Sequence, residues 1–231
     1  MRQGFLVSVL MLGWLTASSV HGEEVWKIAS LNWEPYSSAR MTTQGNAIQK
    51  LRTLLKQQNI TLQVDFYPWA RAKRIAQEAE YVGYFPAWPE EVGDGFVASP
   101  VIDWSWIAVL KQAGRDVNFQ QLDQLFESYK VGLVSTYVCP DAITRSALSS
   151  SGNVVYAPNE ASLLKMLVAG RQDCAVTDPN VMMYLSERDG IGQIETVRTL
   201  FKKELVLAMR ASADNQHRIE RLKSLLQDPA L

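Results

Sequence analysis

The sequence predicts an α/β fold of two lobes, because three features of the chain agree. Segments typical of strands alternate with segments typical of helices, which favours a largely parallel sheet covered by helices. The alternation occurs in two series of similar size, separated by an aromatic segment at residues 101–111. We therefore expect two lobes rather than one continuous sheet. A late strand and helix follow the second series and return to the first lobe, so the chain crosses twice and forms a hinge.

The first series has the order β-α-β-α-β. Residues 24–30 (EVWKIAS) predict a strand, residues 47–59 an amphipathic helix and residues 60–67 (ITLQVDFY) an alternating strand. Pro68 begins a helix over 68–80, at the first-turn position where a proline loses no hydrogen bond. Residues 81–88 then form a short strand and loop.

The second series repeats the pattern after an initial helix. Helices are expected at 118–128, 140–150, 159–170 and 179–190, and strands at 130–136, 153–157 and 173–178. Asn159 and Gly170 are typical N-cap and C-cap residues for the helix between them.

The late strand at 204–210 and the helix at 215–228 require a return crossing near residues 198–204. We therefore assign residues 23–105 together with 204–231 to lobe one, and residues 106–203 to lobe two. A hinged pair of α/β lobes encloses a cleft.

The N-terminus has the features of a secretory signal peptide. Arg2 is followed by an apolar run at 5–15 and by small residues up to Gly22, which predicts a signal peptide over residues 1–22. No later apolar run approaches the roughly 20 residues that span a bilayer. We expect a protein secreted to the periplasm.

Charge and cysteine content exclude several classes of partner. A formal net charge of −1 argues against nucleic acid or an anionic membrane surface. Cys139 and Cys174 would pair by default in an oxidising compartment, but they fall at opposite ends of neighbouring predicted strands, so a disulfide stays open. Only His21 and His217 are present, and the first leaves with the signal peptide, so we expect neither zinc nor another cofactor.

Six segments in order carry a family resemblance: WEPYSS, YPWARAKRIAQ, FPAWPEE, VASPVIDWSW, VGLVSTY and AGRQDCAVTD. This order resembles the periplasmic solute-binding proteins of ABC importers, of the type that binds polar amino acids. The resemblance covers almost the whole mature chain, and it depends on order and spacing rather than on one motif. It implies a type II periplasmic binding fold, a small-molecule ligand, a membrane permease as partner and a monomer that is not an enzyme.

Aromatic residues are expected at the cleft because connections at the carboxyl ends of parallel strands line it. Trp33 and Tyr36 follow the first strand and would form a stacking platform for a ligand. The alternative is that Trp33 covers the core of its lobe. Trp69 and Arg71 lie at the start of a helix, where a cation is unfavourable, so Arg71 meets either a ligand, a carboxylate or solvent.

Two departures from the family's pattern concern the ligand's carboxylate. The resemblance implies Thr-Pro-Glu-Arg where this chain has WPEE, so Trp88 replaces the threonine and Glu91 replaces the arginine. It also implies Gly-Thr where Thr136 and Tyr137 stand. A bidentate arginine is the natural clamp for a carboxylate, and that clamp is missing.

A cation fits these departures better than an α-amino acid. Asp178 matches the aspartate that pairs with a ligand ammonium in the family, and aromatic faces beside carboxylates bind cations. The alternatives are that Asp178 only caps the helix beginning at Pro179, and that Glu90 and Glu91 are surface charges. Trp104 and Trp106 share one strand face and either line the back of the cleft or seal the interface between lobes.

Two other functions are weighed against a transport binding protein. A stand-alone periplasmic sensor would share the fold and present its ligand-bound form to a receptor. A cleft lyase or dehydratase would need an acid/base pair such as Glu90 or Glu91 with Asp178, whereas Ser99 and Ser135 have no histidine to activate them. Recovery of the ligand unchanged would separate binding from catalysis.

Overall fold

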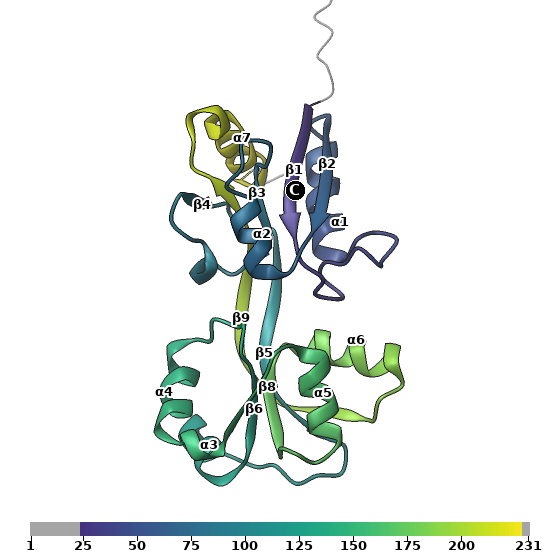
Figure 1. The fold of residues 1–231 in the computed structure, drawn as a ribbon, viewed down its shortest axis with the longest axis vertical. Helices are drawn as coiled ribbons and strands as arrows, with labels where there is room; N and C mark the ends of the chain where they lie inside the picture. Colours follow the sequence, from purple (N-terminus) through teal and green to yellow (C-terminus); the bar gives the residue numbers. More distant parts are fainter. Residues whose placement is uncertain (1–23, 228–231) are drawn as a thin grey trace, which may run out of the picture.

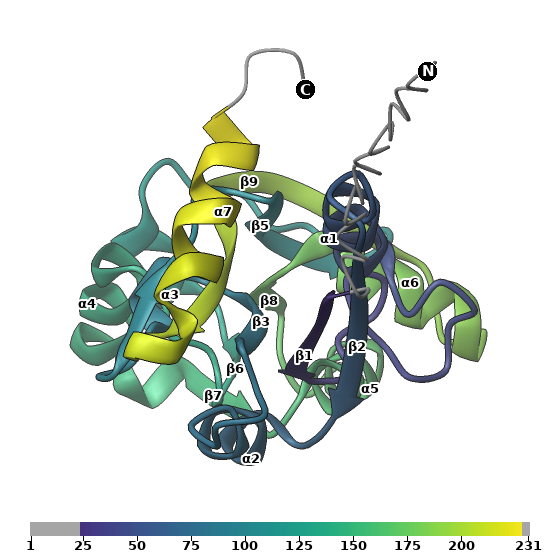
Figure 2. The same cartoon turned by 90° about the horizontal axis from the view of Figure 1, so that it is seen from above.

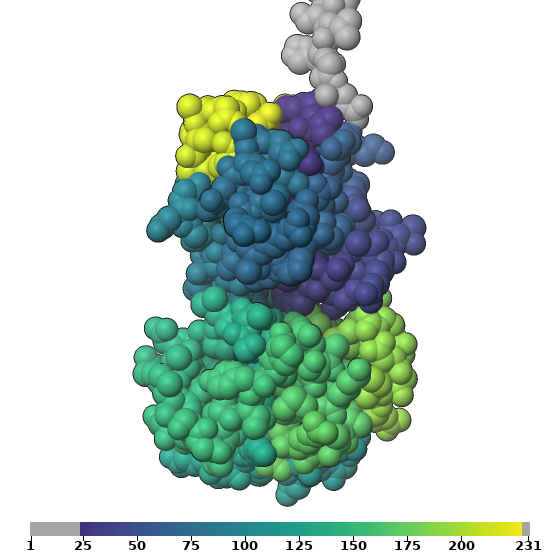
Figure 3. All heavy atoms as spheres, viewed as in Figure 1, coloured from purple at the N-terminus to yellow at the C-terminus, as the bar shows by residue number. Residues whose placement is uncertain are grey.

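The computed structural model describes residues 24–227, which form two α/β lobes stacked along the long axis (Figures 1 and 3). The expectation of a two-lobed α/β fold with two hinge crossings is confirmed. The predicted signal peptide at 1–22 lies outside the described residues. Within 24–227, no helix combines the length and apolar character needed to cross a membrane.

The first lobe is built on three parallel strands. β1 pairs in parallel with β2 on one side and with β3 on the other. Figure 2 shows α1, α2 and α7 arranged around these strands. The elements are β1 (Glu24–Ser30), α1 (Asn46–Lys56), β2 (Ile60–Phe66), α2 (Trp69–Ile75), β3 (Gly83–Ala87), the 3₁₀ turn η1 (Pro89–Glu91) and β4 (Phe96–Ala98).

The second lobe has a parallel core of β7, β6 and β8, with β6 in the centre. Helices alternate with these strands, as the periodicity of the sequence predicts. The elements are α3 (Leu122–Ser128), β6 (Val131–Val134), α4 (Asp141–Ser149), the 3₁₀ turn η2 (Ser151–Asn153), β7 (Val154–Ala157), α5 (Glu160–Val168), β8 (Cys174–Thr177) and α6 (Pro179–Asp189).

Two long antiparallel strands connect the lobes: β5 (Asp103–Gln112) and β9 (Ile194–Arg210). Hydrogen bonding is therefore continuous in the order β2-β1-β3-β9-β5-β8-β6-β7, so the expectation of two separate sheets is wrong. The late strand begins ten residues before the predicted 204, at Ile194. Residues 195–204 are mostly polar, and their strand structure comes from pairing with β5 rather than from apolar alternation.

The C-terminal segment packs on the first lobe. After the hinge, β9 pairs in antiparallel fashion with β3 and β4. The 3₁₀ turn η3 (Ala213–Asn215) and α7 (Gln216–Gln227) follow. Arg218 and Arg221 of α7 contact the Glu24 carboxylate at 3.2 and 2.7 Å, which joins the last helix to the first strand.

Both cysteines are free. Cys174 begins β8 opposite Val131, at the start of parallel β6, whereas Cys139 follows the far end of β6. The disulfide that the sequence leaves open is therefore not formed. Burial raises the pKa of Cys174 to about 12, so its thiol stays protonated.

Candidate functional site

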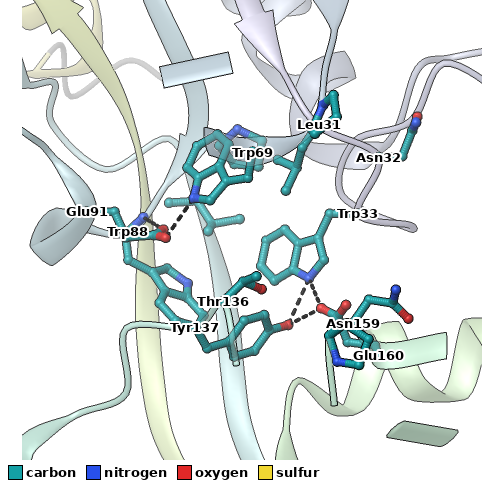
Figure 4. A pocket seen from close by; sticks show the side chains of 14 residues that line it. Leu31, Asn32, Trp33, Trp69, Trp88, Glu91, Thr136, Tyr137, Asn159 and Glu160 are labelled. Atoms are coloured by element: carbon teal, nitrogen blue, oxygen red, sulfur yellow. Dashed lines mark hydrogen bonds between the residues drawn. The ribbon is translucent and has the colours of Figure 1, made fainter. Parts of the chain in front are cut away.

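A cavity of about 340 Å³ lies between the lobes (Figure 4). This volume is at the small end of the range for ligand sites, which is about 300–1,000 Å³. The lining residues come from both lobes and from one hinge strand: Leu31, Asn32, Trp33, Pro68, Trp69, Pro86, Trp88, Glu91, Thr136, Tyr137, Pro158, Asn159, Glu160 and Leu205.

The wall from the first lobe is formed by residues at the carboxyl ends of parallel strands. Trp33 follows β1, Trp69 follows β2 and Trp88 follows β3. Because β1 pairs in parallel with both other strands, these ends meet at one edge of the sheet. The rings of Trp33 and Trp88 make an edge contact, with centroids 6.2 Å apart.

The wall from the second lobe has the same origin. Thr136 and Tyr137 follow β6, and Asn159 and Glu160 follow β7, its parallel neighbour. The Asn159 side chain accepts a hydrogen bond from the Ser162 backbone N–H and caps α5. Glu160, in the first turn of this helix, lines the cavity.

Hydrogen bonds cross the cavity between the lobes (Figure 4). The Trp33 indole Nε1 donates to the Tyr137 hydroxyl at 2.9 Å and to the Glu160 carboxylate at 2.8 Å. The Tyr137 hydroxyl itself donates to the same carboxylate. Burial and the Glu160 charge raise the pKa of Tyr137 well above its ordinary value, so this hydroxyl keeps the proton that it donates to Glu160.

Glu91 provides a second carboxylate from the first lobe. Its Oε1 accepts from the Trp69 indole at 2.8 Å, and its Oε2 accepts from the Trp88 backbone N–H at 3.1 Å. Burial raises the pKa of Glu91, while the Trp69 hydrogen bond and the charges of Lys73 and Lys203 act against this rise. None of the described residues that line the cavity is a lysine, arginine or histidine.

Tyr36 and Asp178 form a second contact between the lobes, outside the cavity lining. The Tyr36 hydroxyl donates to Asp178 Oδ2 at 3.0 Å and accepts from the Asn180 side chain at 2.9 Å. Asp178 Oδ1 accepts from the Asn180 and Val181 backbone N–H groups and caps α6. Asp178 therefore combines a capping role with a contact between the lobes.

The remaining predicted residues lie elsewhere. Trp104 and Trp106 line a shallow groove with Tyr36 and Tyr184 on another side of the hinge. Arg71 is exposed and lies 5.2 Å from the centre of the Tyr67 ring.

Six of the ten predicted site residues thus meet in one cavity, and Tyr36, Arg71, Trp104 and Asp178 do not line it. Glu160 is a lining residue that the sequence analysis does not predict. The signal was present, because Glu160 directly follows the helix N-cap Asn159 at the end of a predicted strand. Among residues 24–227, no group of three or more histidine, cysteine, aspartate or glutamate side chains is arranged to hold a metal ion.

A scan of the sequence against known protein families finds no match, and no curated protein matches it either. Solved structures do match in fold. A histidine kinase sensor domain with similarity to periplasmic binding proteins has a TM-score of 0.68 at 17% identity, with 88% of this chain and 90% of that chain covered. An ancestral arginine-binding protein bound to arginine gives 0.69 at 15% identity, with 88% and 91% covered.

The GluR0 ligand-binding core in complex with L-glutamate has a TM-score of 0.69 at 13% identity, covering 87% of this chain and 91% of that chain. At such identities the matches establish the fold. They confirm the type II periplasmic binding fold that the order of segments predicted.

Proposed function

We propose that this protein captures a small cationic solute in the cavity between its lobes and presents the closed form to a membrane permease of an ABC importer. One observation carries the proposal: a cavity between the lobes is lined by four aromatic rings and two carboxylates, and none of its lining residues within 24–227 has a basic side chain. The lobes in this proposal are residues 23–105 with 204–231, and residues 106–203. In this proposal the protein acts in the periplasm, after removal of the signal peptide.

The chemistry of the lining favours a cation over a free amino acid. A cation over a tryptophan or tyrosine face gains about 0.5–2 kcal/mol, depending on how far it is desolvated. A ligand carboxylate, by contrast, would meet Glu91 where an arginine would be needed. Glu91 and Glu160 are also preorganised, because indole N–H groups hold both.

A thermal-shift screen tests the proposal. Amines and quaternary ammonium compounds should raise the melting temperature more than amino acids, short peptides or aromatic acids. A ligand at 100 times its dissociation constant stabilises the folded state by about 2.7 kcal/mol. A largest shift from glutamate or another acidic amino acid would contradict the cationic assignment.

A sensor is the second candidate function, and the likeness to a histidine kinase sensor domain supports it. The ligand-bound protein would then bind a receptor and shift its signalling state, instead of delivering the ligand to a permease. Cross-linking in membranes with and without the bound ligand separates the two. A ligand-dependent adduct with a permease supports transport, and one with a receptor kinase supports sensing.

We propose binding rather than catalysis. His217 is exposed on α7 and lies 3.6 Å from Glu24, and it is not among the residues that line the cavity. Incubation of the ligand with the protein, followed by mass spectrometry, should return the ligand unchanged. A product that accumulates beyond one equivalent would assign an enzyme.

A further inference from the structure

The two carboxylates of the cavity lie on opposite sides of it and belong to different lobes. Figure 4 shows Glu91 beside Trp69 and Trp88 on one side, and Glu160 beside Asn159 on the other. Glu91 ends η1 in the first lobe, and Glu160 begins α5 in the second. The cavity therefore holds a carboxyl group at two separate points.

Both carboxylates are held in the same way, by an indole from the first lobe. Trp69 Nε1 donates to Glu91, and Trp33 Nε1 donates to Glu160, each at 2.8 Å. Each carboxylate accepts one further hydrogen bond, from the Trp88 backbone N–H or from the Tyr137 hydroxyl. An ionised carboxylate accepts about four hydrogen bonds, so each retains capacity for an ammonium group.

Two lysines near Glu91 lie over the rings of cavity tryptophans, and the Lys203 Nζ is 4.9 Å from the centre of the Trp88 ring. The Lys203 Nζ contacts the Glu90 carboxylate at 2.6 Å. The Lys73 Nζ lies 5.4 Å from the centre of the Trp69 ring. Neither lysine lines the cavity. Among the described residues, no ion pair within 4.0 Å involves Glu91 or Glu160, and the charges of Lys73 and Lys203 act on Glu91 only from farther away. A cationic ligand would therefore add the first direct ion pair to each carboxylate.

Between the two carboxylates the lining is mostly aromatic or aliphatic, with Thr136 as a polar residue among these side chains (Figure 4). Trp33, Trp88 and Tyr137 form a cluster in which ring centroids are 4.9 to 6.3 Å apart. Leu31, Pro86 and Leu205 add apolar surface. Such a lining suits a short methylene chain, because apolar surface gains free energy when it is removed from water.

We propose that the ligand is a linear organic dication of the α,ω-diamine class, with one ammonium group at Glu91 and the other at Glu160. The inference rests on the proposed function and narrows its ligand class. A dication bridges a carboxylate on each lobe, so it has a larger differential affinity for the closed form than a monocation, which reaches only one. Unlike an amino acid, a diamine has no carboxylate group, which would lie against Glu91 without a basic partner.

Isothermal titration calorimetry at neutral pH compares 1,4-diaminobutane with n-pentylamine, which has nearly the same shape and one charge fewer. We expect the diamine to bind at least tenfold more tightly. A series from 1,3-diaminopropane to 1,6-diaminohexane should show one preferred length. Equal binding of the two amines would overturn the dication while leaving the proposed cation binding intact.

Two substitutions assign the ends of the ligand. Glu160→Gln and Glu91→Gln keep an oxygen acceptor for the indole donors but remove the charge. In each variant the preference for the diamine should fall below threefold, while n-pentylamine binding changes by no more than about threefold. Glu127→Gln, at an exposed position of α3, makes the same change in net charge and should retain the full preference.

The outcomes distinguish the two proposals. If only one of the two glutamine variants folds, as judged by circular dichroism and melting, that variant alone decides. A retained preference in the folded variant overturns the assigned end. If no amine binds but another solute does, the dication and the cationic ligand both fail. If no solute binds, the binding function itself fails.

Discussion

Asp178 is an ionisable residue buried between the lobes, and its environment links protonation to stability. Its side chain is fully buried. Burial raises its pKa to about 6, although hydrogen bonds from the Trp106, Val181 and Asn180 backbones and from Tyr36 act in the opposite direction. An aspartate in the unfolded chain titrates near 3.9. The folded protein therefore binds more protons than the unfolded chain between these two values.

The free energy of unfolding should depend on pH through Asp178. The contribution of this residue is fully present below about pH 4 and is lost as the pH rises through about 6. Relative to Asp178→Asn, the wild-type protein should therefore gain of order 2 kcal/mol as the pH falls from 7 to 4. Urea unfolding of both proteins across this range measures the difference.

The control for this measurement is Asp116→Asn, because Asp116 is exposed and lies outside the cavity lining. The difference between this variant and the wild type should be nearly constant over the same pH range. A flat difference for Asp178→Asn as well would show that the carboxylate titrates at its ordinary value and that burial does not control it.

The position of individual residues could be predicted from the sequence where a backbone rule fixed it, whereas their role in ligand binding stays a prediction. Trp33 and Trp69 each follow a parallel strand, and the rule for carboxyl ends placed both at the cleft, whereas Trp88 and Tyr137 were expected there from the family resemblance. The same rule placed Tyr36 at the cleft, and Tyr36 does not line the cavity. The prediction that Trp104 lines the cleft is not met by this cavity. Alternation along β5 does not determine which face of the strand borders the cavity. Ser105, the neighbour of Trp104 on the opposite face, does not line the cavity either; it is fully buried, and its hydroxyl accepts from the Trp88 indole at 2.9 Å.

At the level of elements, periodicity identified strands with apolar faces and missed what depends on pairing. β6, β7 and β8 lie within their predicted ranges because their side chains are largely apolar. The first half of β9 was missed because it is mostly polar and gains its structure from β5. The predicted helix at 68–80 ends early, at Ile75, where turns lead the chain into β3.

β3 also depends on a close approach that spacing does not reveal. Gly83 pairs with Met209 of β9, and a Cβ at this glycine would lie 1.9 Å from the Ala208 carbonyl oxygen. Both strands continue to cavity residues, Trp88 after β3 and Leu205 within β9. The geometry of the cavity thus depends on the absence of a side chain at Gly83.

Gly83→Ala should destabilise the protein by more than about 2 kcal/mol, because the contact is with backbone that cannot move without breaking the ladder. Urea unfolding measures the loss. Gly152→Ala is the matched control, since a Cβ there has no atom within 4 Å, and it should change stability by less than about 0.5 kcal/mol. Equal stability of the two variants would mean that β3 and β9 separate at little cost.

At the level of the whole molecule, the loop after β1 holds the two lobes together. Trp33 bonds to Tyr137 and Glu160, and Tyr36 bonds to Asp178 and Asn180, all of which lie in the second lobe. The sequence indicated two lobes and a hinge. The way they contact each other depends on side-chain directions, which residue spacing does not determine.

Trp33→Phe combined with Tyr36→Phe should shift the ligand-free protein toward a more open arrangement. The double variant keeps an aromatic ring at each position, although the phenyl ring at position 33 is smaller than the indole. It removes four hydrogen bonds between the lobes, each worth about 0.5–1.5 kcal/mol. Small-angle X-ray scattering should show a larger radius of gyration than in the wild type. Tyr129→Phe, which removes a hydroxyl bonded to Asn118 within the second lobe, should leave the scattering unchanged. An unchanged radius in the double variant would mean that ring packing and the β5–β9 hinge set the closure without these bonds.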